Sequence, residues 1–138
     1  MSLILDTGPL VAFLNRRDPY QEWVSLQWSR IKPPLHTCES VLSEACFLLT
    51  RHKGGCGAVL DLVQRGVIQI SFQMADHMES ISRLMNKYSD IPMSLADACL
   101  VRMSELDEHS QILTIDQDFK TYRRHGRQTI PLVTPFKR

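Results

Sequence analysis

The sequence predicts an α/β fold with three layers, in which helices cover both faces of a central, mostly parallel sheet. Short apolar runs alternate with longer amphipathic segments along the 138 residues, without a repeat or a low-complexity linker. Strands and helices that alternate at these lengths are typical of β–α units, which need a parallel sheet buried on both sides. The length and the content of 43% hydrophobic and 22% charged residues fit one globular domain over residues 1–138.

Short apolar or β-branched runs predict the strands. The first run, Leu3-Ile4-Leu5, is apolar throughout, as in a strand that is buried on both faces. The later runs are bounded by proline, glycine or polar residues, which are frequent at strand ends. The expected strands are residues 2–5, 35–37, 67–72, 111–115 and 129–133.

Apolar residues at helical spacing, together with recognisable end signals, predict the helices. Pro9 suits a first helical turn, and Asp18-Pro19 fits an N-cap followed by a proline at the first helical position. Gly54-Gly55 and Gly66 fit helix ends. The expected helices are residues 9–14, 19–31, 39–52, 58–64, 76–88, 94–108 and 118–124.

Cellular location is read from two absences in the sequence. No apolar run reaches membrane-spanning length, and the N-terminus has no basic region or cleavage site, so we expect a cytoplasmic protein without a membrane partner.

The four cysteines form no C-x-x-C pair, and we therefore expect reduced thiols that pack as small hydrophobic side chains. His36-Thr37-Cys38 lacks the second ligand pair that a zinc site needs. The cysteines are Cys38, Cys46, Cys56 and Cys99.

The formal net charge of +1 indicates no partner, but the charges are unevenly distributed. No acidic residue follows Asp118, whereas six basic residues do. Such a segment suits a polyanionic ligand, and it suits a solvated basic surface equally well. The basic residues are Lys120, Arg123, Arg124, Arg127, Lys137 and Arg138.

Three acidic residues fall where the predicted fold would bring them together. Asp6 and Asp116 follow the first and fourth strands, and the carboxyl ends of parallel strands share one edge of a sheet. Each is also a good N-cap. Glu44 lies three residues after Val41 and four before Leu48, beside the apolar stripe of its helix. A carboxylate there is costly unless it is paired or binds metal, or unless its head group reaches water.

Asp97 has a complete alternative explanation, because Ser94-Leu95-Ala96-Asp97 has the spacing of a capping box. Taken together, however, the acids fit a metal site better than independent caps. Mg²⁺ and Mn²⁺ prefer carboxylate oxygens, and crowded carboxylates repel one another without a cation. The candidate metal-binding and catalytic residues are Asp6, Glu44, Asp97 and Asp116.

The sequence around these acids resembles the PIN-domain ribonucleases, and its Gly54-Gly55 break and basic ending resemble their bacterial VapC-like toxin branch. The resemblance implies a PIN-like fold and hydrolysis of RNA phosphodiester bonds that depends on one or two Mg²⁺ or Mn²⁺ ions. It implies that Asp6, Glu44, Asp97 and Asp116 hold the metal. The supporting residues are expected to be Thr114, Thr7, Asp118 and Ser94, and the RNA contacts Arg123, Arg124 and Arg127. The matching motifs are residues 5–10, 43–45, 92–98 and 113–119.

One position departs from the resemblance. Relatives often carry a further Asp where this chain has Ser94, so the number of metal ions stays open. A toxin role implies a cognate antitoxin, and a homodimer is also expected from the resemblance. Trp23 and Trp28 are candidates for the dimer surface, or else belong to the core.

Two other functions compete with a ribonuclease. A haloacid-dehalogenase-like phosphatase would use Asp6 as a nucleophile in a D-x-D-x-T motif, but Gly8 stands where the second Asp is needed. A catalytically weak or inactive PIN-like domain that only binds RNA or a protein is favoured by Ser94 alone.

Overall fold

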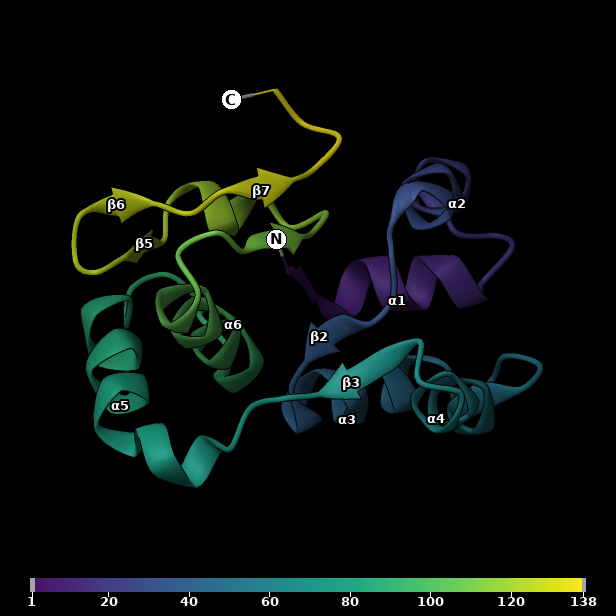
Figure 1. Cartoon of the computed structure of the whole chain (residues 1–138), viewed down its shortest axis with the longest axis horizontal. Coiled ribbons are helices and arrows are strands. Elements are labelled where there is room, and N and C mark those ends of the chain that lie inside the picture. Colours follow the sequence, from purple (N-terminus) through teal and green to yellow (C-terminus); the bar gives the residue numbers. More distant parts are fainter. Residues whose placement is uncertain (1, 138) are drawn as a thin grey trace.

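A five-stranded parallel sheet forms the centre of the protein, as the computed structural model of residues 2–137 shows (Figure 1). The strand order is β3-β2-β1-β4-β7, and each neighbouring pair is parallel. The predicted parallel α/β sheet is therefore confirmed. The strands are β1 (Leu3–Leu5), β2 (Leu35–Thr37), β3 (Ile68–Ile70), β4 (Gln111–Leu113) and β7 (Leu132–Val133).

Helices cover the sheet on both sides. In Figure 1, α5 and α6 lie to the left of the sheet, whereas α1, α2 and α4 lie to its right. This gives the three layers that the alternating pattern predicts. The helices are α1 (Thr7–Leu14), α2 (Gln21–Arg30), α3 (Glu39–Leu48), α4 (Gly55–Gln64), α5 (Met78–Lys87) and α6 (Leu95–Leu106), with 3₁₀ turns η1 (Met74–His77) and η2 (Gln117–Lys120).

The helix predicted over residues 118–124 is wrong. Its first part is the 3₁₀ turn η2, and a hairpin of β5 (Arg123–Arg124) and β6 (Gln128–Thr129) follows. The hairpin turn contains His125 and Gly126 with φ of 51° and 80°. These left-handed conformations reverse the chain. Residues other than glycine seldom adopt them, so His125 gives no indication of the turn in the sequence.

Asp18 is not the N-cap that the sequence predicts. Helix α2 begins at Gln21, and the Asp18 carboxylate instead accepts the N–H of Tyr20 at 2.9 Å, in a turn that precedes the helix. Helical spacing also predicts that Leu48, Met78 and Leu95 lie on the buried faces of their helices, and this prediction is wrong. Leu48, Met78 and Leu95 are 53%, 48% and 40% exposed, because each lies at or next to a helix end, where the packed face is incomplete.

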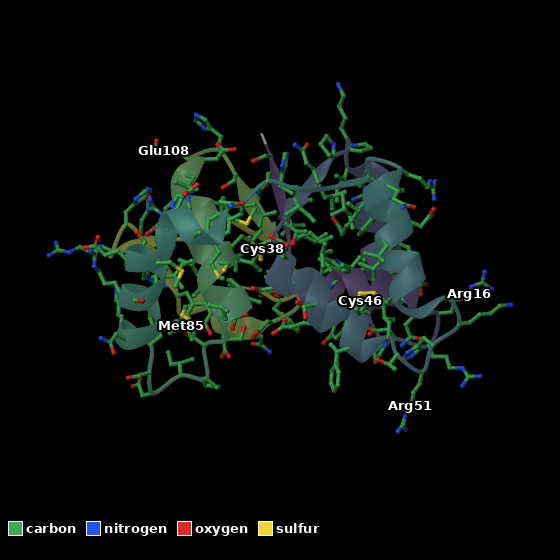
Figure 2. The ribbon with its side chains drawn as sticks, turned by 90° about the horizontal axis from the view of Figure 1, so that it is seen from below. Arg16, Cys38, Cys46, Arg51, Met85 and Glu108 are labelled. Carbon is green, nitrogen blue, oxygen red and sulfur yellow. A yellow bond between two sulfur atoms is a disulfide. The ribbon has the colours of Figure 1, made fainter. Side chains whose placement is uncertain are left out.

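Two of the four cysteines contradict the prediction of reduced thiols. Cys46 and Cys56 form a disulfide between α3 and α4, and Figure 2 shows its yellow sulfur–sulfur bond beside the Cys46 label. The predicted helix over 39–52 ends early, so the chain turns back and brings two residues that are ten positions apart to a Cα–Cα distance of 4.4 Å. Cys38 and Cys99 are buried free thiols, as expected.

The core extends to the carboxyl edge of the sheet. Leu5 and Leu113 are fully buried at the ends of β1 and β4, and the first polar side chains follow directly after them. Trp23 and Trp28 are half-buried and pack against the core, and Trp28 stacks on Phe13 with ring centroids 3.9 Å apart. Both tryptophans therefore contribute to packing. Within residues 2–137, no helix is long and apolar enough to cross a membrane.

Candidate active site

The paired ends of β1 and β4 create the site. The two strands run in parallel with Leu5 opposite Leu113, so the residues that follow them, Asp6 and Thr114, are neighbours. The Asp6 N–H donates to the Leu113 carbonyl at 3.1 Å, and the Thr114 hydroxyl donates to Asp6 Oδ2 at 2.7 Å. Sheet register therefore fixes the position of Asp6.

A cavity of about 840 Å³ opens at this edge, and the four predicted acids all line it. They reach it from the residue after β1, from α3, from α6 and from the segment after β4, so only the tertiary fold assembles them. Thr7 and Ser94 line the cavity too, whereas Thr114 supports it from the buried side through Asp6. The acids are Asp6, Glu44, Asp97 and Asp116.

Asp6 is the most buried of the four carboxylates, with 5% of its surface exposed. Oδ1 accepts the N–H of Thr7 at 2.7 Å as the N-cap of α1, and Oδ2 accepts the Thr114 hydroxyl. Burial raises the pKa of Asp6 to about 7, and the negative charges of Asp97 and Asp116 add to this shift against the two hydrogen bonds. The Asp6 carboxyl therefore holds its proton more tightly than an exposed aspartate does, and a bound cation would favour its ionised form.

Glu44 is held by a side chain from a different helix. The Thr7 hydroxyl donates to Glu44 Oε1 at 2.7 Å and so connects α1 to α3. Oε2 accepts no hydrogen bond from residues 2–137, and Glu44 lines the cavity. Thr7 is thus a positioning residue for Glu44.

Asp97 caps α6 and lines the cavity at the same time. Its Oδ2 accepts the Ser94 N–H at 3.3 Å, while Ser94 Oγ accepts the Asp97 N–H at 3.0 Å, which completes the predicted capping box. The Tyr122 hydroxyl donates to the same Oδ2 at 3.1 Å. Oδ1 has no donor within the described residues. Capping and metal binding are therefore compatible in this side chain.

Burial is the main cause of the pKa shifts of Asp97 and Tyr122. Burial raises the pKa of Asp97, and the charge of Asp116 adds to the shift. Burial and the Asp97 carboxylate also raise the pKa of the Tyr122 hydroxyl, so Tyr122 remains a hydrogen-bond donor. Sequence reasoning missed Tyr122, because its partner lies 25 residues away and no local pattern marks it.

Asp116 is oriented by the turn that follows β4. Its Oδ1 accepts the N–H of Asp118 at 2.9 Å, and its own N–H donates to Thr114 Oγ1 at 2.9 Å. The Thr114 hydroxyl thus bridges Asp116 and Asp6. Asp118 supports Asp116 through its backbone and does not line the cavity.

The carboxylate oxygens of these four acids fit a hard divalent cation. None of the four acids forms an ion pair within residues 2–137, and three of them keep one oxygen without a hydrogen-bond donor. Oxygen ligands of this kind suit Mg²⁺ and Mn²⁺. No group of three or more acidic, histidine or cysteine side chains in this part of the chain is closed around a metal position, so the carboxylates would have to converge on binding.

The three arginines expected to contact RNA lie outside this cavity. Arg124 is 5% exposed, and its guanidinium donates to the carbonyls of Ser104 and Glu108 at 3.1 Å each. Arg124 therefore fastens the hairpin to the end of α6 and is not free to bind RNA. Arg123 lines a second cavity, and Arg127 is exposed in the hairpin turn.

Fold and cavity together define an α/β domain with an acidic site at the carboxyl edge of a parallel sheet. The PIN domain family matches residues 3–124, a segment that contains all four acids, and the chain belongs to this family. No curated protein matches the chain in sequence.

Solved structures share this fold. VapC20 of Mycobacterium tuberculosis, described as a sarcin–ricin loop cleaving toxin, is 23% identical with a TM-score of 0.74, over 87% of this chain and 94% of that one. VapBC2 of Rickettsia felis, bound to a DNA fragment from its promoter, is 18% identical with a TM-score of 0.63, over 97% and 98%.

Two observations argue against the phosphatase alternative: the chain belongs to the PIN family, and the structure leaves no room for a side chain at Gly8. A Cβ atom on Gly8 would lie 2.7 Å from Ile115 Cγ1. An aspartate therefore does not fit at the position where that motif needs its second carboxylate.

Proposed function

We propose that this protein is an endoribonuclease that requires Mg²⁺ or Mn²⁺ and acts as a VapC-like toxin under the control of a cognate antitoxin. The observation that carries the proposal is the set of four carboxylates on one cavity, without a cationic partner among residues 2–137, in a member of the PIN family. The toxin activity described for VapC20 supports RNA as the substrate, and the VapBC2 complex supports an antitoxin partner.

The residues of the chain would prepare the cavity for hydrolysis. A bound divalent cation supplies Lewis acidity, which activates water and stabilises the negative charge of the leaving oxygen. Asp6, Glu44, Asp97 and Asp116 would hold one or two such ions. In-line attack of water on the phosphodiester would leave a 5′-phosphate and a 3′-hydroxyl.

Hydrogen bonds from the surrounding residues would keep these carboxylates in place. Thr114 holds Asp6 Oδ2, and Thr7 holds Glu44 Oε1. Asp97 is held from two sides, by Ser94 and by Tyr122. Outer hydrogen bonds of this kind orient metal ligands and contribute to affinity.

Replacement of Asp6 by asparagine tests the proposal. Asp6→Asn keeps the shape of the side chain and removes its charge, so cleavage of RNA in Mg²⁺ or Mn²⁺ should fall below detection while the circular dichroism spectrum is retained. Asp61→Asn is the matched control, because Asp61 is an exposed acid on α4 that pairs with Arg65 and lies outside the acidic cavity. Equal cleavage by Asp6→Asn and the wild type would contradict the assignment.

A PIN domain that binds RNA without cleaving it is the second candidate. It is favoured by the open arrangement of the acids and by Ser94 in place of a further carboxylate. Calorimetric titration with Mn²⁺ separates the two functions when RNA cleavage is followed in the same preparation. RNA binding without cleavage in any divalent metal would support this second function.

Exposed apolar side chains beside the acidic cavity favour a binding site for a protein partner. Phe47 and Leu48 lie one helical turn after Glu44, line the cavity, and are 78% and 53% exposed. We propose that a segment of the antitoxin covers them, and that the toxin is a homodimer which acts in the cytoplasm. Light scattering of the protein alone and with a co-expressed antitoxin measures both assemblies.

A further inference from the structure

The acidic cavity has no cationic side chain of its own, among the described residues, that would bind the RNA backbone. No lysine or arginine among residues 2–137 lines it, although phosphate binding depends on such residues. Cationic side chains gather instead around a second cavity of about 330 Å³, between α5, α6 and the β5–β6 hairpin. Figure 1 shows these elements together at one end of the molecule. The charged side chains that line this basic cavity are Arg83, Lys87, Arg102, Arg123 and Glu105.

Contacts with neighbouring elements hold two of these cations in place. Lys87 Nζ donates to the Gly126 carbonyl at 2.7 Å, and so connects α5 to the hairpin. One guanidinium nitrogen of Arg123 donates to the Lys120 carbonyl at 2.7 Å. A set of cations that is already positioned loses little freedom when it binds an anion.

The remaining charges leave the cavity positive. Glu105 is the one carboxylate among its lining residues, and it is already engaged by Arg102 at 3.1 Å and by the N–H of His125 at 2.7 Å. Arg83 pairs with Glu79 at 3.4 Å, but both side chains are largely exposed. Such a pair contributes little, so Arg83 is available to a stronger anion.

The basic cavity lies close to the acidic one. Asp97 and Arg102 lie on the same helix, and at 1.5 Å per residue the line from Asp97 to Arg102 and Glu105 covers about 8 to 12 Å along the axis. The chain at residues 122–123 separates the two cavities, because the Tyr122 hydroxyl contacts Asp97 while Arg123 lines the basic side. One RNA strand could therefore reach both.

We propose that the basic cavity binds a backbone phosphate of the RNA substrate, a few nucleotides from the bond that is cleaved in the acidic cavity. The inference rests on the proposed function and names the surface that would hold the substrate. Lys87 and Arg83 would contact the phosphate directly. Arg102 and Arg123 would add to the positive potential from their fixed positions.

A charge-matched pair of double variants tests this site. Arg83→Gln/Lys87→Gln removes two exposed cations from the cavity, and Arg65→Gln/Lys53→Gln removes two from elsewhere on the surface. Arg65 is a close match for Arg83, because it also pairs with an exposed acid four residues away on its own helix. Circular dichroism confirms that both variants are folded.

RNA binding is measured without divalent metal, so that cleavage does not interfere. The probe is a fluorescent single-stranded RNA, and anisotropy is recorded over a series of salt concentrations. The cavity variant should bind about tenfold more weakly, with a salt slope reduced by about 0.7, the value expected for one lost phosphate contact. The control variant should keep the slope of the wild type. Equal losses in the two variants would overturn the proposal.

Further measurements distinguish an RNA site from a site for another ligand, and a failure of this proposal from a failure of the proposed function. Inorganic phosphate that binds at Lys87 and Arg83, with RNA affinity unchanged in the cavity variant, would show a free-anion site and contradict the proposal. Loss of antitoxin binding with unchanged RNA affinity would contradict it equally. If the wild type never cleaves RNA, the proposed function fails, but the salt-slope comparison still decides whether the cavity binds RNA.

Discussion

Asp6 shows how one side chain serves both the fold and the candidate site. From the sequence, an N-cap and a metal ligand are competing explanations, yet in the structure Asp6 caps α1 and also lines the acidic cavity. Asp97 combines the same two roles. A carboxylate has two oxygens with two lone pairs each, so a capping hydrogen bond leaves capacity for a cation.

The raised pKa of Asp6 predicts how stability depends on pH. The unfolded chain has the ordinary value of 3.8 and the folded chain about 7, so the folded state holds the proton more tightly. Stability without metal should therefore fall as pH rises between these values, by up to about 1.4 kcal/mol per unit, and level off above them. The melting temperature in EDTA should be lower at pH 8 than at pH 5.5.

Added Mg²⁺ should raise the melting temperature more at pH 8 than at pH 5.5, because a cation binds the ionised carboxylate. Differential scanning fluorimetry at the two pH values measures both effects. Asp6→Asn is the control, and its EDTA melting temperature should vary less with pH. A wild-type melting temperature that rises from pH 5.5 to pH 8 in EDTA would contradict the interpretation.

At the level of elements, the structure depends on how helices begin and how they are joined. The start of α6 is local, because Ser94 and Asp97 are three residues apart and satisfy each other's backbone. The connection of α3 to α4 is different. Both helices were predicted, but their closure by Cys46 and Cys56 depends on where α3 ends. The local sequence pattern therefore predicts the capping box at the start of α6, but it does not predict the disulfide between α3 and α4.

Ser94 allows a test that separates capping from metal binding. Ser94→Ala removes the cap and should lower the stability by about 0.5–2 kcal/mol. Ser94→Asp keeps a good capping residue and adds a carboxylate to the cavity, so it should bind Mn²⁺ more tightly than the wild type. Chemical denaturation and calorimetric titration measure the two effects. Weaker Mn²⁺ binding by Ser94→Asp would argue against a metal site at the start of α6.

The Cys46–Cys56 disulfide should stabilise the α3–α4 pair. It closes a loop with a sequence separation of ten residues, and loops of that size contribute about 2–3 kcal/mol by restricting the unfolded chain. A reductant should lower the unfolding midpoint of the wild type by a corresponding amount. Cys46→Ser should start lower and respond little to reductant. Cys99→Ser, which leaves the disulfide intact, should keep the response of the wild type.

Across the whole molecule, charge is separated in a way that the sequence suggests only in part. The absence of acids after Asp118 indicates a basic region, but the fold divides its arginines among different roles. Arg124 is buried, Arg123 lines the basic cavity, and α5 contributes Arg83 and Lys87 to the same cavity. The cationic surface therefore combines two parts of the chain that lie about forty residues apart.

The sequence by itself determined the alternation of strands and helices and the parallel sheet, because periodicity and end signals are local, and it indicated the four acids that line the candidate site. The tertiary structure alone decided which side chains support those acids. Thr7 reaches Glu44 across 37 positions, and Thr114 reaches Asp6 across 108. Such contacts form only when sheet register and helix packing bring distant segments to hydrogen-bonding distance, and no local pattern in the sequence encodes that distance.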